Sequence, residues 1–132
     1  MTHPVEHTEE EWRRLLPPER FRILREEGTE PAFANAYWDE HGEGVYRCGA
    51  CGAELFRSAD KFDSGTGWPS FVRPVSADAI ETLEDSSHGM TRVEVRCANC
   101  GSHLGHVFKD GPAPTGERYC MNSGALDFER GP

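Results

Sequence analysis

The chain has 132 residues, the length of a single domain, and only 36% of them are hydrophobic, which predicts a modest core that a bound metal would help to hold. The net charge of −9 argues against a nucleic-acid partner, because such binding depends on Lys and Arg. No apolar run reaches the roughly 18 residues of a membrane span, and the N-terminus lacks a signal-peptide apolar region. We therefore expect a cytoplasmic protein with no membrane partner, and a monomer as the default for a small, acidic chain.

Two short helices are expected near the N-terminus. Thr8 and Glu11 have the spacing of a capping box, in which each side chain accepts a hydrogen bond from the other residue's backbone. Pro17 ends the first helix, Pro18 can begin the second, and Gly28 is placed to stop it. The apolar residues expected on their buried faces are Trp12, Leu15, Leu16, Phe21, Ile23 and Leu24.

The rest of the chain is expected to be mainly β, because nine prolines and fourteen glycines favour turns over long helices. Residues 29–44 are predicted to form an irregular segment that Phe33, Tyr37 and Trp38 hold against the body. Strand signals follow this segment at residues 45–47, 54–56, 80–83, 91–97 and 118–128.

The clearest strand pattern is that of residues 91–97. Val93, Val95 and Cys97 alternate there with charged residues, which is the period-two pattern of a half-buried strand. A turn at His88-Gly89 is expected to join it to the strand before.

Four of the five cysteines occur as two Cys-x-x-Cys pairs, a spacing typical of one tetrahedral zinc site. A glycine follows the second cysteine of each pair, at positions 52 and 101, where a positive φ often lets backbone amides turn toward sulfur. Four thiolates leave no open position for water, so the predicted zinc is structural. Its ligands would be Cys48, Cys51, Cys97 and Cys100.

Two alternative interpretations compete with this zinc site. The pairs could be redox dithiols or disulfides, but a reducing cytoplasm favours metal binding. A rival ligand set combines the second pair with His103 and His106. That set is too crowded, because a local zinc finger leaves about 12 residues between its two pairs, and it would leave the first cysteine pair without a metal.

Cys120 is then the one cysteine without a partner. A lone cysteine is often only a small buried apolar residue, and an isolated histidine is often structural. Here Arg118 is two residues away, on the same face if this is a strand, and a cation favours the thiolate. His103 and His106 are candidate acids for an oxygen that leaves a substrate. The combination favours a reactive thiol.

Two further residues have open interpretations at this stage. Trp68 follows a glycine-flanked loop and precedes a proline, so it either fills the core or holds its indole over a pocket. Asp110 precedes Gly111 and is either a turn residue or a carboxylate that orients one of the imidazoles.

Taken together, the motifs resemble those of the B-type methionine-R-sulfoxide reductases. They extend from about residue 29 to residue 128 in the expected order. The matching stretches are Cys48-Gly-Ala-Cys51-Gly, the segment Lys61 to Phe71 with Ser-Gly-Thr-Gly-Trp-Pro-Ser-Phe, Cys97-x-x-Cys100, Ser102-His-Leu-Gly-His-Val-Phe108, Asp110-Gly-Pro112 and Arg118-Tyr-Cys-Met-Asn-Ser123.

The resemblance implies a fold and an organisation. It implies two antiparallel β-sheets, short N-terminal helices and a structural zinc remote from the chemistry. One domain over residues 1–132 would contain a helical segment (1–28) and a zinc-stapled β core (29–130).

The resemblance also implies roles for the site residues. Cys120 would attack the sulfur of methionine-R-sulfoxide, in proteins or peptides, and would be left as a sulfenic acid. The residues that would assist are His103, His106, Asn122, Arg118 and Asp110. Those that would surround the S-methyl group are Trp68 and Phe108.

One position departs from the commonest family pattern. Many members have a resolving cysteine where this chain has Thr66, and a hydroxyl cannot form a disulfide. We therefore predict a one-cysteine enzyme whose sulfenic acid is reduced by an external thiol such as thioredoxin, glutaredoxin with glutathione, or another small thiol.

Non-catalytic functions are the competing hypotheses. A zinc-knuckle β domain of this kind could instead bind a ligand or peptide in an aromatic pocket, or dock onto a partner as a structural zinc ribbon. Neither hypothesis needs a nucleophile, so Cys120→Ser separates them from the enzyme.

Overall fold

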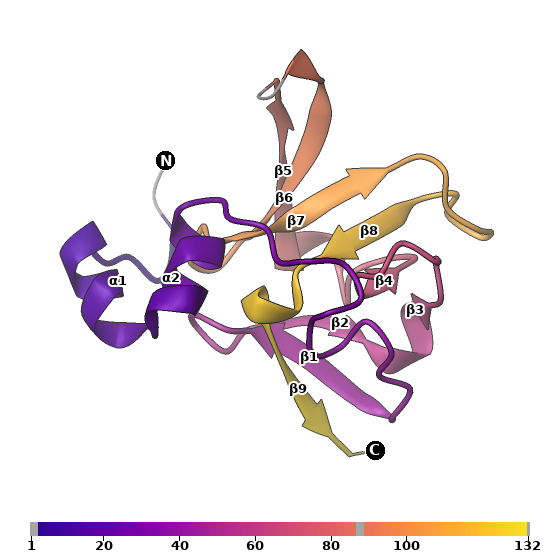
Figure 1. The fold of residues 1–132 in the computed structure, drawn as a ribbon, viewed down its shortest axis with the longest axis horizontal. Coiled ribbons are helices and arrows are strands. Elements are labelled where there is room, and N and C mark those ends of the chain that lie inside the picture. The colour runs from indigo at the N-terminus through magenta and orange to yellow at the C-terminus, as the bar shows by residue number, and fades with distance from the viewer. Residues whose placement is uncertain (1–2, 87–88, 132) are drawn as a thin grey trace.

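The computed structural model describes residues 3–86 and 89–131, which form two antiparallel β-sheets with two short α-helices at the N-terminal end (Figure 1). The predicted mainly β fold is therefore confirmed. The smaller sheet has the strand order β2-β1-β9, and the larger has the order β3-β4-β8-β7-β6-β5. In the part of the chain described, no helix is long and apolar enough to cross a membrane.

The bounds of the elements follow the predicted segments, with β3, β4 and β7 as additions and with the predicted segment 118–128 divided into β8 and β9, which belong to different sheets. The helices are α1 (Glu9–Leu15) and α2 (Pro18–Arg25). The smaller sheet consists of β1 (Gly44–Cys48), β2 (Glu54–Arg57) and β9 (Leu126–Arg130). The larger sheet consists of β3 (Lys61–Phe62), β4 (Ser70–Phe71), β5 (Ile80–Asp85), β6 (Arg92–Cys97), β7 (His103–Phe108) and β8 (Arg118–Met121). His88 of the predicted turn lies outside the described residues.

The first helix begins where the capping box predicted it. Thr8 Oγ1 accepts a hydrogen bond from the Glu11 backbone at 3.1 Å, and Glu11 Oε1 accepts one from the Thr8 backbone at 2.7 Å. Trp12 and Leu16 are buried as predicted, but Leu15 is 59% exposed. The backbone becomes extended at Leu16, so this residue enters the core in place of its neighbour.

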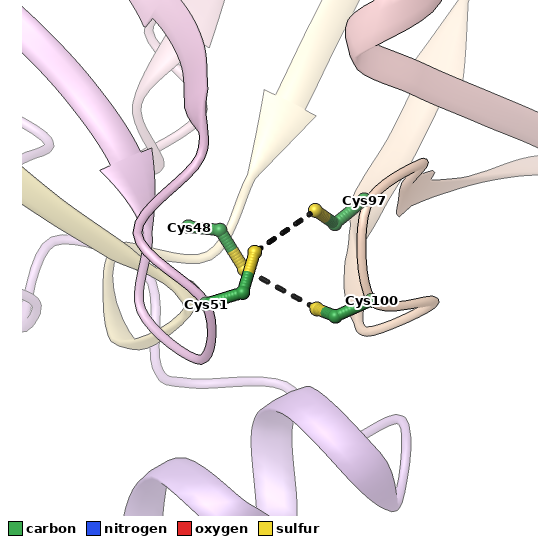
Figure 2. Close-up of side chains that lie close together, drawn as sticks. All are labelled: Cys48, Cys51, Cys97 and Cys100. Atoms are coloured by element: carbon green, nitrogen blue, oxygen red, sulfur yellow. Dashed lines mark hydrogen bonds between the residues drawn. The ribbon is translucent and has the colours of Figure 1, made fainter. Parts of the chain in front are cut away.

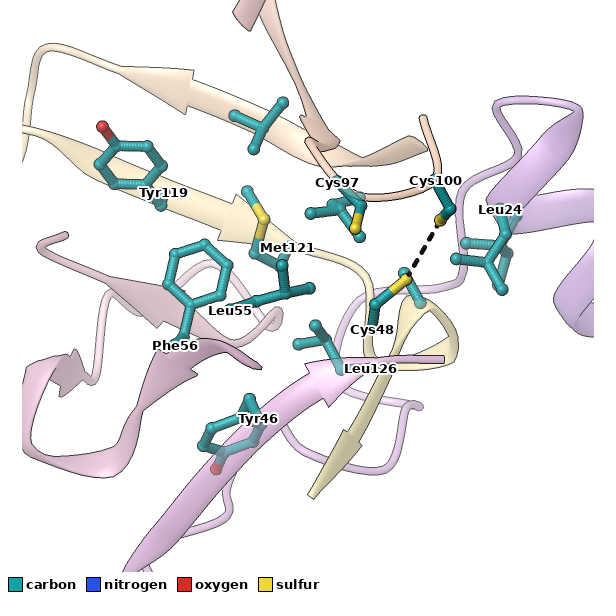
Figure 3. Close-up of a cluster of buried hydrophobic side chains, with 14 of the residues drawn as sticks. Leu24, Tyr46, Cys48, Leu55, Phe56, Cys97, Cys100, Tyr119, Met121 and Leu126 are labelled. Carbon is teal, nitrogen blue, oxygen red and sulfur yellow. Dashed lines mark hydrogen bonds between the residues drawn. The ribbon is translucent and has the colours of Figure 1, made fainter. Parts of the chain in front are cut away.

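The core lies between the two sheets (Figure 3). Phe56 of β2 and Phe71 of β4 are fully buried and stack with their ring centroids 4.4 Å apart, so they join one sheet to the other. Leu24 of α2 closes the end of the core where Cys48 and Cys100 meet. Burying a side chain of this size contributes roughly 1.5–3 kcal/mol, so these contacts stabilise the arrangement of the sheets.

The expected alternation of β6 is partly wrong. Val93 is 38% exposed, whereas Glu94 is 3% exposed. β5 and β6 form a hairpin that projects from the body (Figure 1), so Val93 has no second sheet to pack against. Glu94 lies nearer the base of the hairpin, where it pairs with His103 and Arg96.

The irregular segment over residues 29–44 is confirmed up to Gly44, which begins β1. Tyr37 fixes it to the smaller sheet, because its hydroxyl accepts a hydrogen bond from the Phe128 backbone at 3.2 Å. Phe33 was expected to help, but it is 55% exposed and contacts Trp38 edge-on instead.

Candidate functional site

Strand register assembles the pocket around Cys120. β8 pairs with β7 so that Cys120 lies opposite His106 and Arg118 lies opposite Phe108. Opposite residues of an antiparallel pair, and residues two apart on one strand, face the same side of a sheet. These four side chains therefore share one face, as their common cavity shows. The same-face prediction for Arg118 and Cys120 is confirmed.

A bulge in β7 brings the two histidines together. Residues three apart on a regular strand face opposite sides of the sheet, which would separate His103 from His106. In the β6–β7 pairing, however, Val95 lies opposite Gly105 and the next residue lies opposite His103, so Leu104 is an extra residue. The imidazole centroids are 5.5 Å apart as a result.

The cavity over this face has a volume of about 290 Å³. Of the residues predicted for the site, those that line it are Thr66, Trp68, His106, Phe108, Arg118, Cys120 and Asn122. His103 and Asp110 lie outside the lining. Sequence reasoning did not assign the other lining residues, which are Thr29, Arg92, Gly105 and Met121.

The Cys120 thiol is under opposing influences. Burial raises its pKa above the ordinary value, while the charge of Arg118 and hydrogen bonds from Thr66 and Arg118 act to lower it. Burial has the larger effect, so the resting cysteine is held toward the thiol form. Ionisation therefore depends on the groups that face the sulfur.

Asp110 acts on the site through Arg118. The Arg118 guanidinium donates to both Asp110 carboxylate oxygens, at 2.9 and 3.1 Å, and lies over the Phe108 ring at 4.4 Å from its centroid. This pair lowers the pKa of Asp110 and fixes the guanidinium beside Cys120. The alternative in which Asp110 orients an imidazole is wrong, because the recorded carboxylate partners of the two imidazoles are Glu94 and Asp85.

His106 is oriented by Asp85, a residue that the sequence analysis did not single out. The His106 Nε2 lies 3.0 Å from Asp85 Oδ2, and Arg92 lies 3.4 Å from the same oxygen. Burial lowers the pKa of His106, and this effect exceeds the opposing hydrogen bond to Asp85. The imidazole is therefore neutral at pH 7, with its Nε2 proton directed at the carboxylate.

His103 is buried beneath His106 and pairs with Glu94. Its Nδ1 lies 2.7 Å from Glu94 Oε2, and Arg96 Nε lies 3.0 Å from the same oxygen. Although burial acts to raise it, the hydrogen bonds from His103 and Arg96 hold the pKa of Glu94 below its ordinary value. His103 is thus a buried imidazole, hydrogen-bonded to Glu94, that supports the imidazole lining the cavity.

Glu30 anchors the irregular segment to the site, although no periodic pattern in the sequence indicated this role. Its carboxylate accepts hydrogen bonds from the backbone amides of Ser123 and Gly124, the latter at 2.8 Å. Its carbonyl accepts from Trp68 Nε1 at 3.0 Å, which fixes the indole. Asn122 is held by its own donor bond to the Leu104 carbonyl at 3.2 Å.

The four paired cysteines form a separate cluster between the ends of β1 and β6 (Figure 2). The Cys48 and Cys100 sulfurs are 3.7 Å apart, and those of Cys51 and Cys97 are 3.6 Å apart. Tetrahedral zinc with sulfur at about 2.3 Å requires sulfurs about 3.8 Å apart, so the cluster fits such an ion. None of the four residues lines the cavity.

Each cysteine pair has the turn that its glycine predicted. Gly52 and Gly101 have φ of 82° and 77°, and each donates to the carbonyl of the first cysteine of its pair. The Asn99 side chain also donates to the Cys51 sulfur at 3.2 Å. These features present four sulfurs to one point, as a closed metal site requires.

Fold and site together define a class of protein: a two-sheet β domain with four cysteines placed to hold a metal and a fifth cysteine in a separate cavity. Comparison with known proteins places the chain within that class. Residues 16–130 match the SelR domain. The chain belongs to this family, as its motifs predicted.

Known relatives are similar to this chain in sequence over nearly their full length. A Synechococcus protein is 64% identical over 126 residues, covering 96% of this chain and 93% of the relative. Proteins of Thiobacillus denitrificans and Leifsonia xyli are 60% and 59% identical, covering 92% and 96% of this chain and 92% of each relative. All three are named peptide methionine sulfoxide reductase MsrB.

Proposed function

We propose that this protein reduces methionine-R-sulfoxide in proteins and peptides to methionine, with Cys120 as the nucleophile. The observation that carries the proposal is the placement of Cys120, the one cysteine outside the metal cluster, in a cavity with Trp68, Arg118 and His106. The activity named for the relatives supports the reaction type.

The proposed chemistry balances without a redox cofactor. The Cys120 thiolate attacks the sulfoxide sulfur, the sulfur–oxygen bond of the substrate breaks, and the oxygen ends on Cys120 as a sulfenic acid. One proton is consumed and two electrons pass from the cysteine sulfur to the substrate sulfur. The departing oxygen needs a proton donor, because an unprotonated oxide is a poor leaving group.

The pocket residues have distinct proposed roles. Trp68 and Phe108 pack around the S-methyl group, and Thr66 lines the cavity beside the nucleophile. Arg118, held by Asp110, favours the thiolate.

The remaining polar residues supply and hold the proton. His106 accepts a proton on its free Nδ1 and passes it to the sulfoxide oxygen, which Asn122 also binds. His103 holds His106 in position from below.

Recycling is proposed to use an external thiol. In the described part of the chain the other four cysteines belong to the metal cluster, so none remains to form a disulfide with Cys120. Thioredoxin, glutaredoxin with glutathione, or another small thiol would reduce the sulfenic acid. We propose the cytoplasm as the compartment, because its reducing conditions keep cysteine thiols available for metal binding and catalysis.

Zinc is the metal proposed for the cluster. Cys48, Cys51, Cys97 and Cys100 would hold it, and a closed four-sulfur site would stabilise the fold without joining the reaction. We propose that the protein acts as a monomer.

A single-turnover experiment tests the function. Metal-loaded protein is mixed, without reductant, with a peptide that contains either R- or S-methionine sulfoxide, and Cys120 is analysed by mass spectrometry. We expect one methionine per protein, from the R peptide only, with one oxygen added at Cys120. No methionine from either epimer would refute the reaction and favour a peptide-binding domain, and Cys120→Ser serves as the inactive control.

A further inference from the structure

Arg92 lines the cavity, but the proposed function gives it no role. It begins β6, and its side chain is 26% exposed. Among the described residues, its guanidinium has one hydrogen-bond acceptor, Asp85 Oδ2 at 3.4 Å. The buried Nε atom has no acceptor in that part of the chain. Because a guanidinium carries five N–H donors, most of the donors of this largely buried group are unused.

Arg118, the other arginine that lines the cavity, shows the contrast. It donates to both carboxylate oxygens of Asp110 and packs over the Phe108 ring. Leaving buried donors without acceptors costs free energy, so native structures usually have a reason for each such group. For a donor at a cavity wall, an acceptor that the ligand brings is such a reason.

Strand register places Arg92 on the face of the sheet that holds the nucleophile, but on the far side of the cavity. Glu94 lies opposite His106, so Arg92, two residues from Glu94 on β6, faces the same side. The strand order β8-β7-β6 puts one strand between Cys120 and Arg92. Since neighbouring strands are about 4.8 Å apart, the β6 and β8 backbones are separated by roughly 10 Å.

This separation decides which part of a methionine sulfoxide residue Arg92 can meet. The sulfoxide oxygen is bonded to the sulfur that Cys120 attacks, so it stays beside the nucleophile and His106. The main chain lies at the other end of a flexible side chain and must leave the cavity at its rim. Its carbonyl oxygen is therefore the acceptor that a side chain on β6 can reach.

The charges around Arg92 favour a neutral acceptor. Asp85 already faces the guanidinium, and the same carboxylate oxygen lies 3.0 Å from His106 Nε2. The Asp85 side chain is mostly buried. A second carboxylate at Arg92 would lie beside Asp85, and like charges held together are unfavourable. A peptide carbonyl adds no charge.

We propose that Arg92 is a specificity-determining residue that donates hydrogen bonds to the main-chain carbonyl oxygen of the methionine sulfoxide residue. This contact fixes the substrate main chain at the rim of the cavity while the side chain presents its sulfur to Cys120. The inference rests on the proposed function and adds to it a binding contact for the part of the substrate that does not react.

The test compares two compounds that share the reacting group. The first is N-acetyl-methionine-R-sulfoxide N-methylamide, and the second has a hydrogen atom in place of its Cα carboxamide group. Binding is measured by NMR titration of metal-loaded protein in the Cys120→Ser background, where no reaction occurs. Arg92→Met is compared with Arg57→Met, the matched control, because Arg57 is an exposed residue of β2 that does not line the cavity.

In Arg92→Met, the dissociation constant of the carboxamide compound should rise about tenfold. This change is equivalent to about 1.4 kcal/mol, close to the lower end of the range for a hydrogen bond from a charged donor. The compound without the carboxamide should bind Arg92→Met and the parent protein equally. Arg57→Met should change neither constant.

Equal weakening of both compounds in Arg92→Met, or weakening of neither, overturns the proposal. The acid N-acetyl-methionine-R-sulfoxide is a third ligand, and an effect confined to it would identify a terminal carboxylate as the acceptor and overturn the assignment to a peptide carbonyl. Should Arg92→Met fail to fold, Arg92→Lys keeps the charge but loses the planar fork, and it must still weaken the carboxamide compound selectively. Because binding is measured without turnover, failure of this proposal and failure of the proposed reaction are separate results.

Discussion

The hydrogen bond between Asp85 and His106 predicts that activity falls by a defined amount when the negative charge of Asp85 is removed. The two side chains are only 12% and 14% exposed, and their oxygen and nitrogen are 3.0 Å apart. Asp85→Asn keeps the shape of the side chain but removes the negative charge. Since Asp85 acts to raise the pKa of His106 against the effect of burial, the substitution should lower that pKa further.

The expected size of the effect follows from the contact. A hydrogen bond to a charged group is worth about 1.5–3 kcal/mol. Arg92 lies 3.4 Å from the same oxygen and shares its charge, so the lower end applies. About 1.4 kcal/mol corresponds to a factor of ten in rate. We therefore expect the single-turnover rate of Asp85→Asn to fall about tenfold.

The assay combines rate with titration. Single turnover of the R-sulfoxide peptide is measured across pH, and the His106 ring proton is followed by NMR, with His106→Asn to assign its signal. Glu84→Gln is the matched control, because Glu84 is an exposed neighbour on β5 and loses the same charge. An unchanged rate with a His106 pKa that stays constant or rises would refute the role given to Asp85.

Three further predictions follow from the site. Arg118→Met should raise the pKa of Cys120, because a lowering charge is lost, and should slow its alkylation near neutral pH; an unchanged rate would contradict this. Thr66→Cys should give a disulfide to Cys120 after turnover, seen as a loss of two hydrogens by mass spectrometry, because both side chains line the same cavity; a persistent sulfenic acid would contradict it. Removing the metal with a chelator should lower the melting temperature and release about one zinc per chain, and Cys51→Ser should do the same, whereas equal stability with and without chelator would argue against a structural metal.

The sequence predicted those features that depend on local spacing. The capping box, the two Cys-x-x-Cys turns and the breaks at proline are set by residues three or four apart, and the structure has each of them. The site residues were found from residue chemistry and family motifs, and seven of the nine line the cavity.

The features that were missed depend on tertiary contacts. Glu94 looks like a surface residue of an alternating strand, and only the facing His103 and Arg96 explain its burial. Asp85 lies 21 residues from His106, and no local pattern connects them. Glu30 lies in an irregular segment and binds backbone amides more than 90 residues away. Neither periodicity nor composition indicates such a contact.

The bulge in β7 shows why spacing alone could not place the histidines. Their His-x-x-His spacing predicts one helical face or two opposite strand faces, and neither describes the site. An extra residue, Leu104, restores the same-side arrangement of the two histidines. The next residue is Gly105, where a Cβ atom would lie 2.1 Å from the Cys120 carbonyl oxygen. The backbone of β8 can therefore approach β7 closely at this point. The strand register sets Cys120 opposite His106, and the neighbouring Gly105 lets the two strands pair closely there, so a glycine with no chemistry of its own helps to bring together the two residues that the proposed reaction requires.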